Sequence, residues 1–160
     1  FDAGFAYYQG KNYEKADSIF DVFTDKYPDE VYGPMMQYNI HRALDSTMEK
    51  GMAVPWAEKY LNLLERDTAK NKKTIIGVAS YLASYHANIV KDREKALEYL
   101  RKMLVLDPTN EIIKNNISVL EKAPATKPPA PTKGGAAPAK AGSPKPSAKA
   151  ATNKEIPIKT

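Results

Sequence analysis

One order of small and bulky residues occurs twice in the chain, and it constrains the fold more than any other feature. Each copy has a small residue, an alanine twelve positions later, two bulky apolar residues on the following helical turns, and a closing proline. The members are Gly4, Ala16, Phe20, Phe23 and Pro28 in the first copy and Ser84, Ala96, Leu100, Met103 and Pro108 in the second. Small residues at fixed places let helix axes approach to about 8 to 10 Å. The order therefore predicts antiparallel pairs of tightly packed helices.

Apolar residues recur at intervals of three and four through the first 122 residues, and no segment shows sustained two-residue alternation. This periodicity predicts an all-α fold. Prolines and short polar residues mark three helix starts, which we expect at Asp29, near Val54 and at Thr109. The expected helices cover residues 1–9, 12–27, 29–46, 54–67, 70–90, 92–106 and 110–122.

The composition changes at Ala123. Residues 123–160 hold eight of the twelve prolines and no aromatic residue, which predicts a disordered tail because little apolar surface is available to offset the entropy of ordering. This tail contains seven lysines and one acidic residue, Glu155, for a net charge of +6. The whole chain carries +5, so residues 1–122 carry −1 and the basic character belongs to the tail.

The repeated order resembles the tetratricopeptide repeat, a helix-turn-helix unit of 34 residues. A partial third copy has Ala57 at the place of Ala16 and Ala96, and the two intervals are 41 and 39 residues. The excess residues fall around 46–55 and 69–73. The stretch KGMAVPWAEKY at 50–60 resembles a loop of a group of bacterial members of the family. The resemblance covers residues 1–122 and implies a solenoid of three hairpins with a capping helix. Because the sequence begins at Phe1 without an initiator methionine or a signal-like block, we expect a truncated or processed domain.

Residues that could carry catalysis or bind metal are few and scattered. The chain has no cysteine and two histidines, His41 and His86, each without a close pattern of metal ligands. Asp29 and Glu30 are expected in a first helical turn, where negative charge favours the helix dipole. The glycines at 134 and 135 lack the Gly-Lys-Ser/Thr ending of a phosphate-binding loop. We therefore predict no catalytic residue, no metal site and no cofactor.

The resemblance implies a concave wall made by the first helix of each repeat. The matching positions form sets at three- and four-residue steps: Phe1, Phe5 and Tyr8, then Tyr32, Met35, Asn39 and Arg42, then Tyr81, Tyr85 and Asn88. Tyrosine and methionine beside asparagine and arginine suit an extended or helical peptide. The alternative is that these aromatic residues pack in the core. A preceding helix would cover Phe1 and Phe5. Tyr81 and Tyr85 fit both interpretations equally.

The expected function is a non-catalytic scaffold or adaptor that binds a protein or peptide partner through this wall. The alternative is a protein that binds a polyanion, such as a nucleic acid, an anionic membrane or an envelope polymer, through the tail lysines. The absence of cysteine fits the bacterial cytoplasm and the periplasm equally well.

Overall fold

The computed structural model describes residues 2–122, in which all regular secondary structure is helical. The α-helices are α1 (Asp2–Gln9), α2 (Tyr13–Lys26), α3 (Tyr32–Leu44), α4 (Val54–Leu64), α5 (Thr68–Tyr85), α6 (Arg93–Leu106) and α7 (Glu111–Lys122). A 3-10 turn, η1 (Glu65–Asp67), precedes α5, and a π-helical turn, η2 (His86–Val90), follows it. The predicted all-α class is confirmed. Phe1 and residues 123–160, including the predicted tail, lie outside the described residues.

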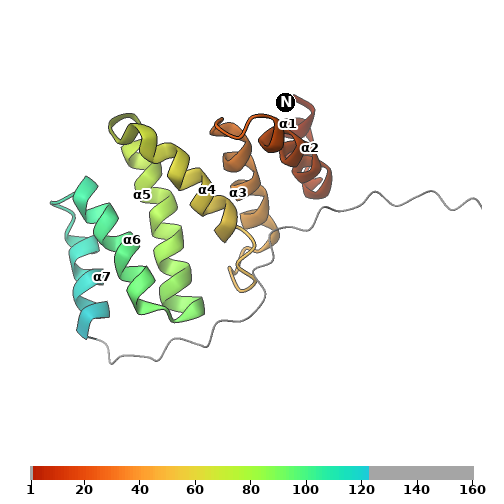
Figure 1. Cartoon of the computed structure of the whole chain (residues 1–160). Helices are drawn as coiled ribbons and strands as arrows, with labels where there is room; N and C mark the ends of the chain where they lie inside the picture. The colour runs from red at the N-terminus through yellow and green to blue at the C-terminus, as the bar shows by residue number, and fades with distance from the viewer. Residues whose placement is uncertain (1, 123–160) are drawn as a thin grey trace, which may run out of the picture. The chain divides into compact units, whose positions relative to one another are not determined.

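Each helix packs against its neighbours in the chain, so that α1 with α2, α3 with α4 and α5 with α6 form hairpins and α7 covers α6 (Figure 1). This nearest-neighbour arrangement is typical of helical repeat proteins. None of the helices within residues 2–122 is long and apolar enough to cross a membrane.

Small residues lie at the helix crossings inside the hairpins. Ala16, Ala57 and Ala96 have no exposed surface. A methyl group built on Gly4 would lie 2.9 Å from Cζ of Phe20, closer than real side chains approach one another. The close packing of α1 on α2 therefore requires a residue without a side chain at position 4.

Side-chain caps begin most of the helices. Asn12, Asp67 and Asp92 accept hydrogen bonds from backbone N–H groups three residues later, at 3.4, 3.1 and 3.1 Å. Asn110 caps α7 by accepting from the N–H of Ile113 at 3.2 Å, so the predicted start at Thr109 is one residue early.

The predicted start of α3 at Asp29 is wrong, because α3 begins at Tyr32 without a side-chain cap. The Asp29 carboxylate instead accepts from Arg66 Nη2 at 2.9 Å, a residue 37 positions away. The acidic pair Asp29 and Glu30 therefore precedes the helix rather than lying in its first turn.

Two apolar clusters form the core. The smaller one contains Ala16, Phe20, Met36 and Ile40 between α2 and α3, and the larger one extends from α3 to α7. Beside the smaller cluster, the buried Thr24 hydroxyl donates to Gln37 Oε1 at 2.8 Å. This bond satisfies polar groups that would be costly to bury alone.

Residues between α3 and α4 form an ordered loop that contains the first predicted insertion. Asp45 is buried, and its Oδ2 accepts from the N–H groups of Lys50 at 3.1 Å and Met52 at 3.2 Å. Met48 and Gly51 both adopt a φ of 63°. A side chain at Gly51 would lie 2.4 Å from the Tyr85 hydroxyl, so glycine is required where the loop meets α5.

The π-helical turn η2 begins with a buried histidine. His86 is stacked on Tyr99 with ring centroids 5.8 Å apart, and neither ring nitrogen has a hydrogen-bond partner within residues 2–122. Burial lowers the pKa of His86, as does the nearby Lys95 charge, against the opposite effect of Asp92, Glu58 and Glu98. The folded protein therefore holds this imidazole in its neutral form.

We expect the melting temperature to fall as pH is lowered from about 7.5 to about 5.5, because His86 takes up a proton more readily in the unfolded chain. The decrease in stability begins near pH 6.5, the ordinary pKa of histidine, and continues down to the lowered pKa of His86 in the folded state. His86→Phe keeps the stacking on Tyr99 and removes the titration, so its melting temperature should depend less on pH. An equal dependence in both proteins would show that His86 is not responsible.

Candidate functional site

Four of the eight predicted binding residues meet in one pocket of about 320 Å³, here named the α3 pocket. It is lined by Tyr8, Asn39, Arg42, Ala43, Asp45, Ser46, Met48 and Tyr81. The pocket combines α1, α3 and α5, which are the first helices of the three hairpins, with the loop that follows α3.

Arg42 is held over two tyrosine rings. Its guanidinium carbon lies 5.2 Å from the centroid of Tyr38 and 5.4 Å from that of Tyr81. These distances are those of cation–π contacts, which orient the charged group without neutralising it. Arg42 is exposed and forms no ion pair within residues 2–122. Arg42 also makes a side-chain hydrogen bond to Tyr38, and a guanidinium has five N–H donors, so further donors are available to a ligand.

Tyr81 belongs both to the core and to the pocket. It is 7% exposed, and its ring packs edge-on against Tyr38 at 5.4 Å. Its hydroxyl is buried and has no hydrogen-bond partner in the described part of the chain. Burial raises the pKa of Tyr81 to about 12, and the charge of Asp45 acts in the same direction. The hydroxyl therefore stays protonated and can donate a hydrogen bond.

Sequence reasoning missed the loop side of the pocket. Asp45, Ser46 and Met48 line it, and all three lie at or beside the extra residues that distinguish this hairpin from a regular repeat. The inserted residues could have been predicted to line a pocket from the position of the insertion, because loops often carry binding residues.

The other four predicted residues do not line this pocket. Tyr32 packs against Phe20 with centroids 5.7 Å apart, and Met35 packs between the two core clusters. Tyr85 lies beside Gly51 and contacts His86 at 5.3 Å. Asn88 is exposed on η2. Of the aromatic residues matched to the wall, Phe5 is 41% exposed, and Phe1 lies outside the described residues.

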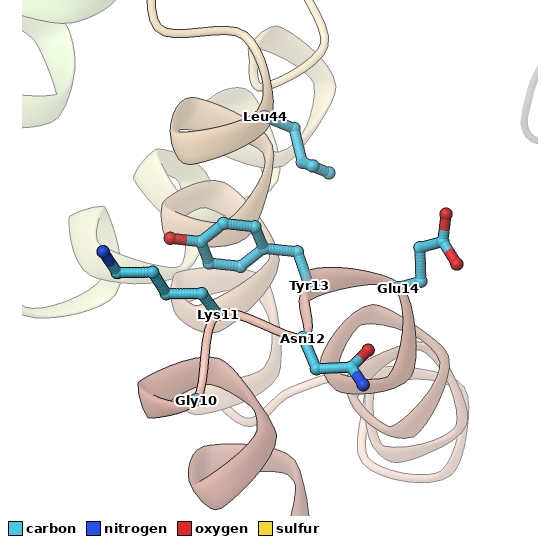
Figure 2. A pocket seen from close by; sticks show the side chains of 6 residues that line it. All are labelled: Gly10, Lys11, Asn12, Tyr13, Glu14 and Leu44. Atoms are coloured by element: carbon cyan, nitrogen blue, oxygen red, sulfur yellow. The ribbon is translucent and has the colours of Figure 1, made fainter.

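A second hollow of about 470 Å³ lies where the α1–α2 turn meets the end of α3, and Gly10, Lys11, Asn12, Tyr13, Glu14 and Leu44 line it (Figure 2). Lys11 and Tyr13 extend to one side of the turn, whereas Asn12 and Glu14 point to the other (Figure 2). Asn12 caps α2, so one of the polar lining residues already has a structural role. We assign no ligand to this hollow.

Both histidines make packing contacts. His41 Nε2 lies 3.1 Å from Asp17 Oδ1, and its ring is stacked on Trp56 at a centroid distance of 6.0 Å. Within residues 2–122, no three histidine, aspartate or glutamate side chains lie close enough together to hold a metal ion.

The hairpins define a helical repeat protein with a pocket between its first helices. Residues 1–30 match the model of the tetratricopeptide repeat family. The structure is similar to a crystal structure of the C-terminal part of a TPR repeat-containing protein from Cytophaga hutchinsonii. The TM-score is 0.65 and the identity is 32% over 73% of this chain. A comparison with curated proteins gave no significant match.

Both findings support the resemblance to the tetratricopeptide repeat family that the spacing of small and bulky residues predicted. The source of the neighbour favours a bacterial origin. The matched region spans 45% of that neighbour's chain. The fold is that of a protein–protein interaction scaffold, and the family is generally non-catalytic.

Proposed function

We propose that the chain is a non-catalytic adaptor that binds a protein or peptide partner along the face formed by α1, α3 and α5. The observation that carries this proposal is the α3 pocket, which collects residues from all three helices. A partner lying across the three helices would contact each repeat at once, which is how repeat proteins make extended binding surfaces.

The chemistry of the pocket supports a peptide. Tyr8 and Met48 provide aromatic and thioether surface, whereas Asn39 and Arg42 provide hydrogen-bond donors. Aromatic residues and arginine are the side chains that most often anchor a protein interface. Because Arg42 rests on two tyrosine rings, little side-chain entropy is lost when it binds a partner.

The test is selection of peptides from a displayed library on the full-length chain, followed by calorimetric titration of the selected peptides. Arg42→Gln should weaken binding about 30-fold, the ratio that corresponds to about 2 kcal/mol for an anchor residue. Arg66→Gln is the matched control, because Arg66 is an exposed arginine whose ion pair with Asp29 lies outside the pocket. Such exposed pairs contribute little to stability.

Peptides that bind the Arg42 variant as tightly as the parent would contradict a site at the α3 pocket. The alternative of polyanion binding predicts a different pattern. In that case binding would fall steeply with salt and be lost when the seven lysines of residues 123–160 are changed to glutamine.

A further inference from the structure

The α3 pocket contains one fixed positive charge and one fixed negative charge. Arg42 is held by the rings of Tyr38 and Tyr81, and Asp45 is held by two backbone N–H groups of its loop. A ligand carboxylate in the pocket would meet the Asp45 charge, and a ligand ammonium would meet the Arg42 charge. An ion of either sign is attracted by one of the two charges and repelled by the other, so it gains little net attraction, whereas a neutral dipole such as an amide can be oriented favourably by both charges.

The pocket also offers hydrogen-bond donors and acceptors together. The Tyr81 hydroxyl is a buried donor without a partner in residues 2–122, and the Asn39 side chain can both donate and accept. Both loop N–H groups donate to Oδ2 of Asp45, and a carboxylate accepts about four hydrogen bonds, so acceptor capacity remains. An uncharged group that both donates and accepts satisfies this set, as an amide does.

We propose that the α3 pocket takes an uncharged amide, from the backbone or a side-chain carboxamide within an extended peptide, and discriminates against a terminal carboxylate or amine. This inference rests on the proposed function and deepens it. According to this inference, the pocket binds an internal segment of a peptide and not a chain end.

The loop wall of the pocket is held in place by contacts within the protein. Met48 and Gly51 have the left-handed backbone conformation, and Gly51 abuts the Tyr85 hydroxyl, so the loop is fixed at its end as well as at Asp45. A wall held in this way needs little ordering when a ligand binds. The positions of the two charges are therefore fixed, and ligands of different charge can bind with different affinities.

The test uses three probes that share an alanine residue: N-acetylalanine N-methylamide, which is neutral, N-acetylalanine, which is anionic, and alanine N-methylamide, which is cationic. Each is titrated into the full-length protein at neutral pH and equal ionic strength. The nuclear magnetic resonance signals of the Asn39 side-chain amide and the Met48 methyl group report the pocket. We expect the neutral probe to bind about tenfold more tightly than either ion.

Three variants make the result specific. Tyr81→Phe removes only the hydroxyl and should weaken binding of the neutral probe about five- to tenfold, whereas Tyr27→Phe, at an exposed tyrosine outside the pocket, should leave it unchanged. Arg42→Gln leaves Asp45 as the remaining charge and should shift the preference toward the cationic probe. A thermal melt of each variant shows that it is folded.

Tighter binding of the anionic or the cationic probe to the parent protein overturns the inference, and so does the absence of shifts at Asn39 and Met48 with all three probes. Neither result bears on whether longer peptides depend on Arg42, which is the separate test of the proposed function. The two proposals can therefore fail independently.

Discussion

Phe20→Ala should lower the free energy of unfolding by about 3 to 5 kcal/mol, the usual cost of removing a buried phenylalanine. Phe20 has no exposed surface, and its ring contacts Tyr32 and fills the space beside Gly4. The cavity left by alanine would lie where α1, α2 and α3 meet, so it could not close by movement of one side chain. Urea denaturation followed by circular dichroism measures the loss.

The matched control is Phe5→Ala in the neighbouring helix. Phe5 is 41% exposed, so Phe5→Ala should lower the free energy of unfolding by well under half as much as Phe20→Ala does. Equal losses at both positions would contradict the assignment of Phe20 to the core.

Gly33→Ala is expected to have the second largest effect. A methyl group at this position would lie 2.3 Å from the Thr24 hydroxyl and 3.0 Å from Cδ1 of Phe23. Relieving this overlap should cost about 1 to 3 kcal/mol. Loss of the Thr24–Gln37 hydrogen bond would add about 1 to 3 kcal/mol, because both groups are buried.

Gly77→Ala provides the control for the same chemical change in α5. Apart from its chain neighbours and the nearby backbone of its own helix, no atom lies within 4 Å of the added methyl group, and alanine favours a helix over glycine by about 1 kcal/mol. The melting temperature should therefore rise for Gly77→Ala and fall for Gly33→Ala. A rise at both positions would show that α2 and α3 are packed less closely than described.

The hairpins could be predicted because local sequence determines them. Ala16, Ala57 and Ala96 stand where helix crossings exclude larger side chains, and all three are fully buried. The start of α3 was misplaced because Asp29 resembles a helix cap but bonds to Arg66, which is distant in sequence. The spacing of neighbouring residues in the sequence cannot predict such a tertiary contact.

The residues of the α3 pocket could be predicted only in part. Helical periodicity places Asn39 and Arg42 on one side of α3, and the structure brings both into the α3 pocket. The contribution of Asp45 depends on the loop conformation, which in turn requires two hydrogen bonds to Asp45 and a close approach of Gly51 to Tyr85. These contacts join α3, the loop and α5, and no periodic pattern encodes them.

The loop between α3 and α4 lines the α3 pocket but is not part of the stacked helices. Its fixed points are Asp45 at one end and Gly51 at the other, and residues 46–50 lie between them. Helix stacking in a repeat array depends on contacts between neighbouring helices and tolerates variation in such a loop. Related chains could thus exchange residues 46–50 and acquire different ligand preferences, while the helical framework is inherited unchanged.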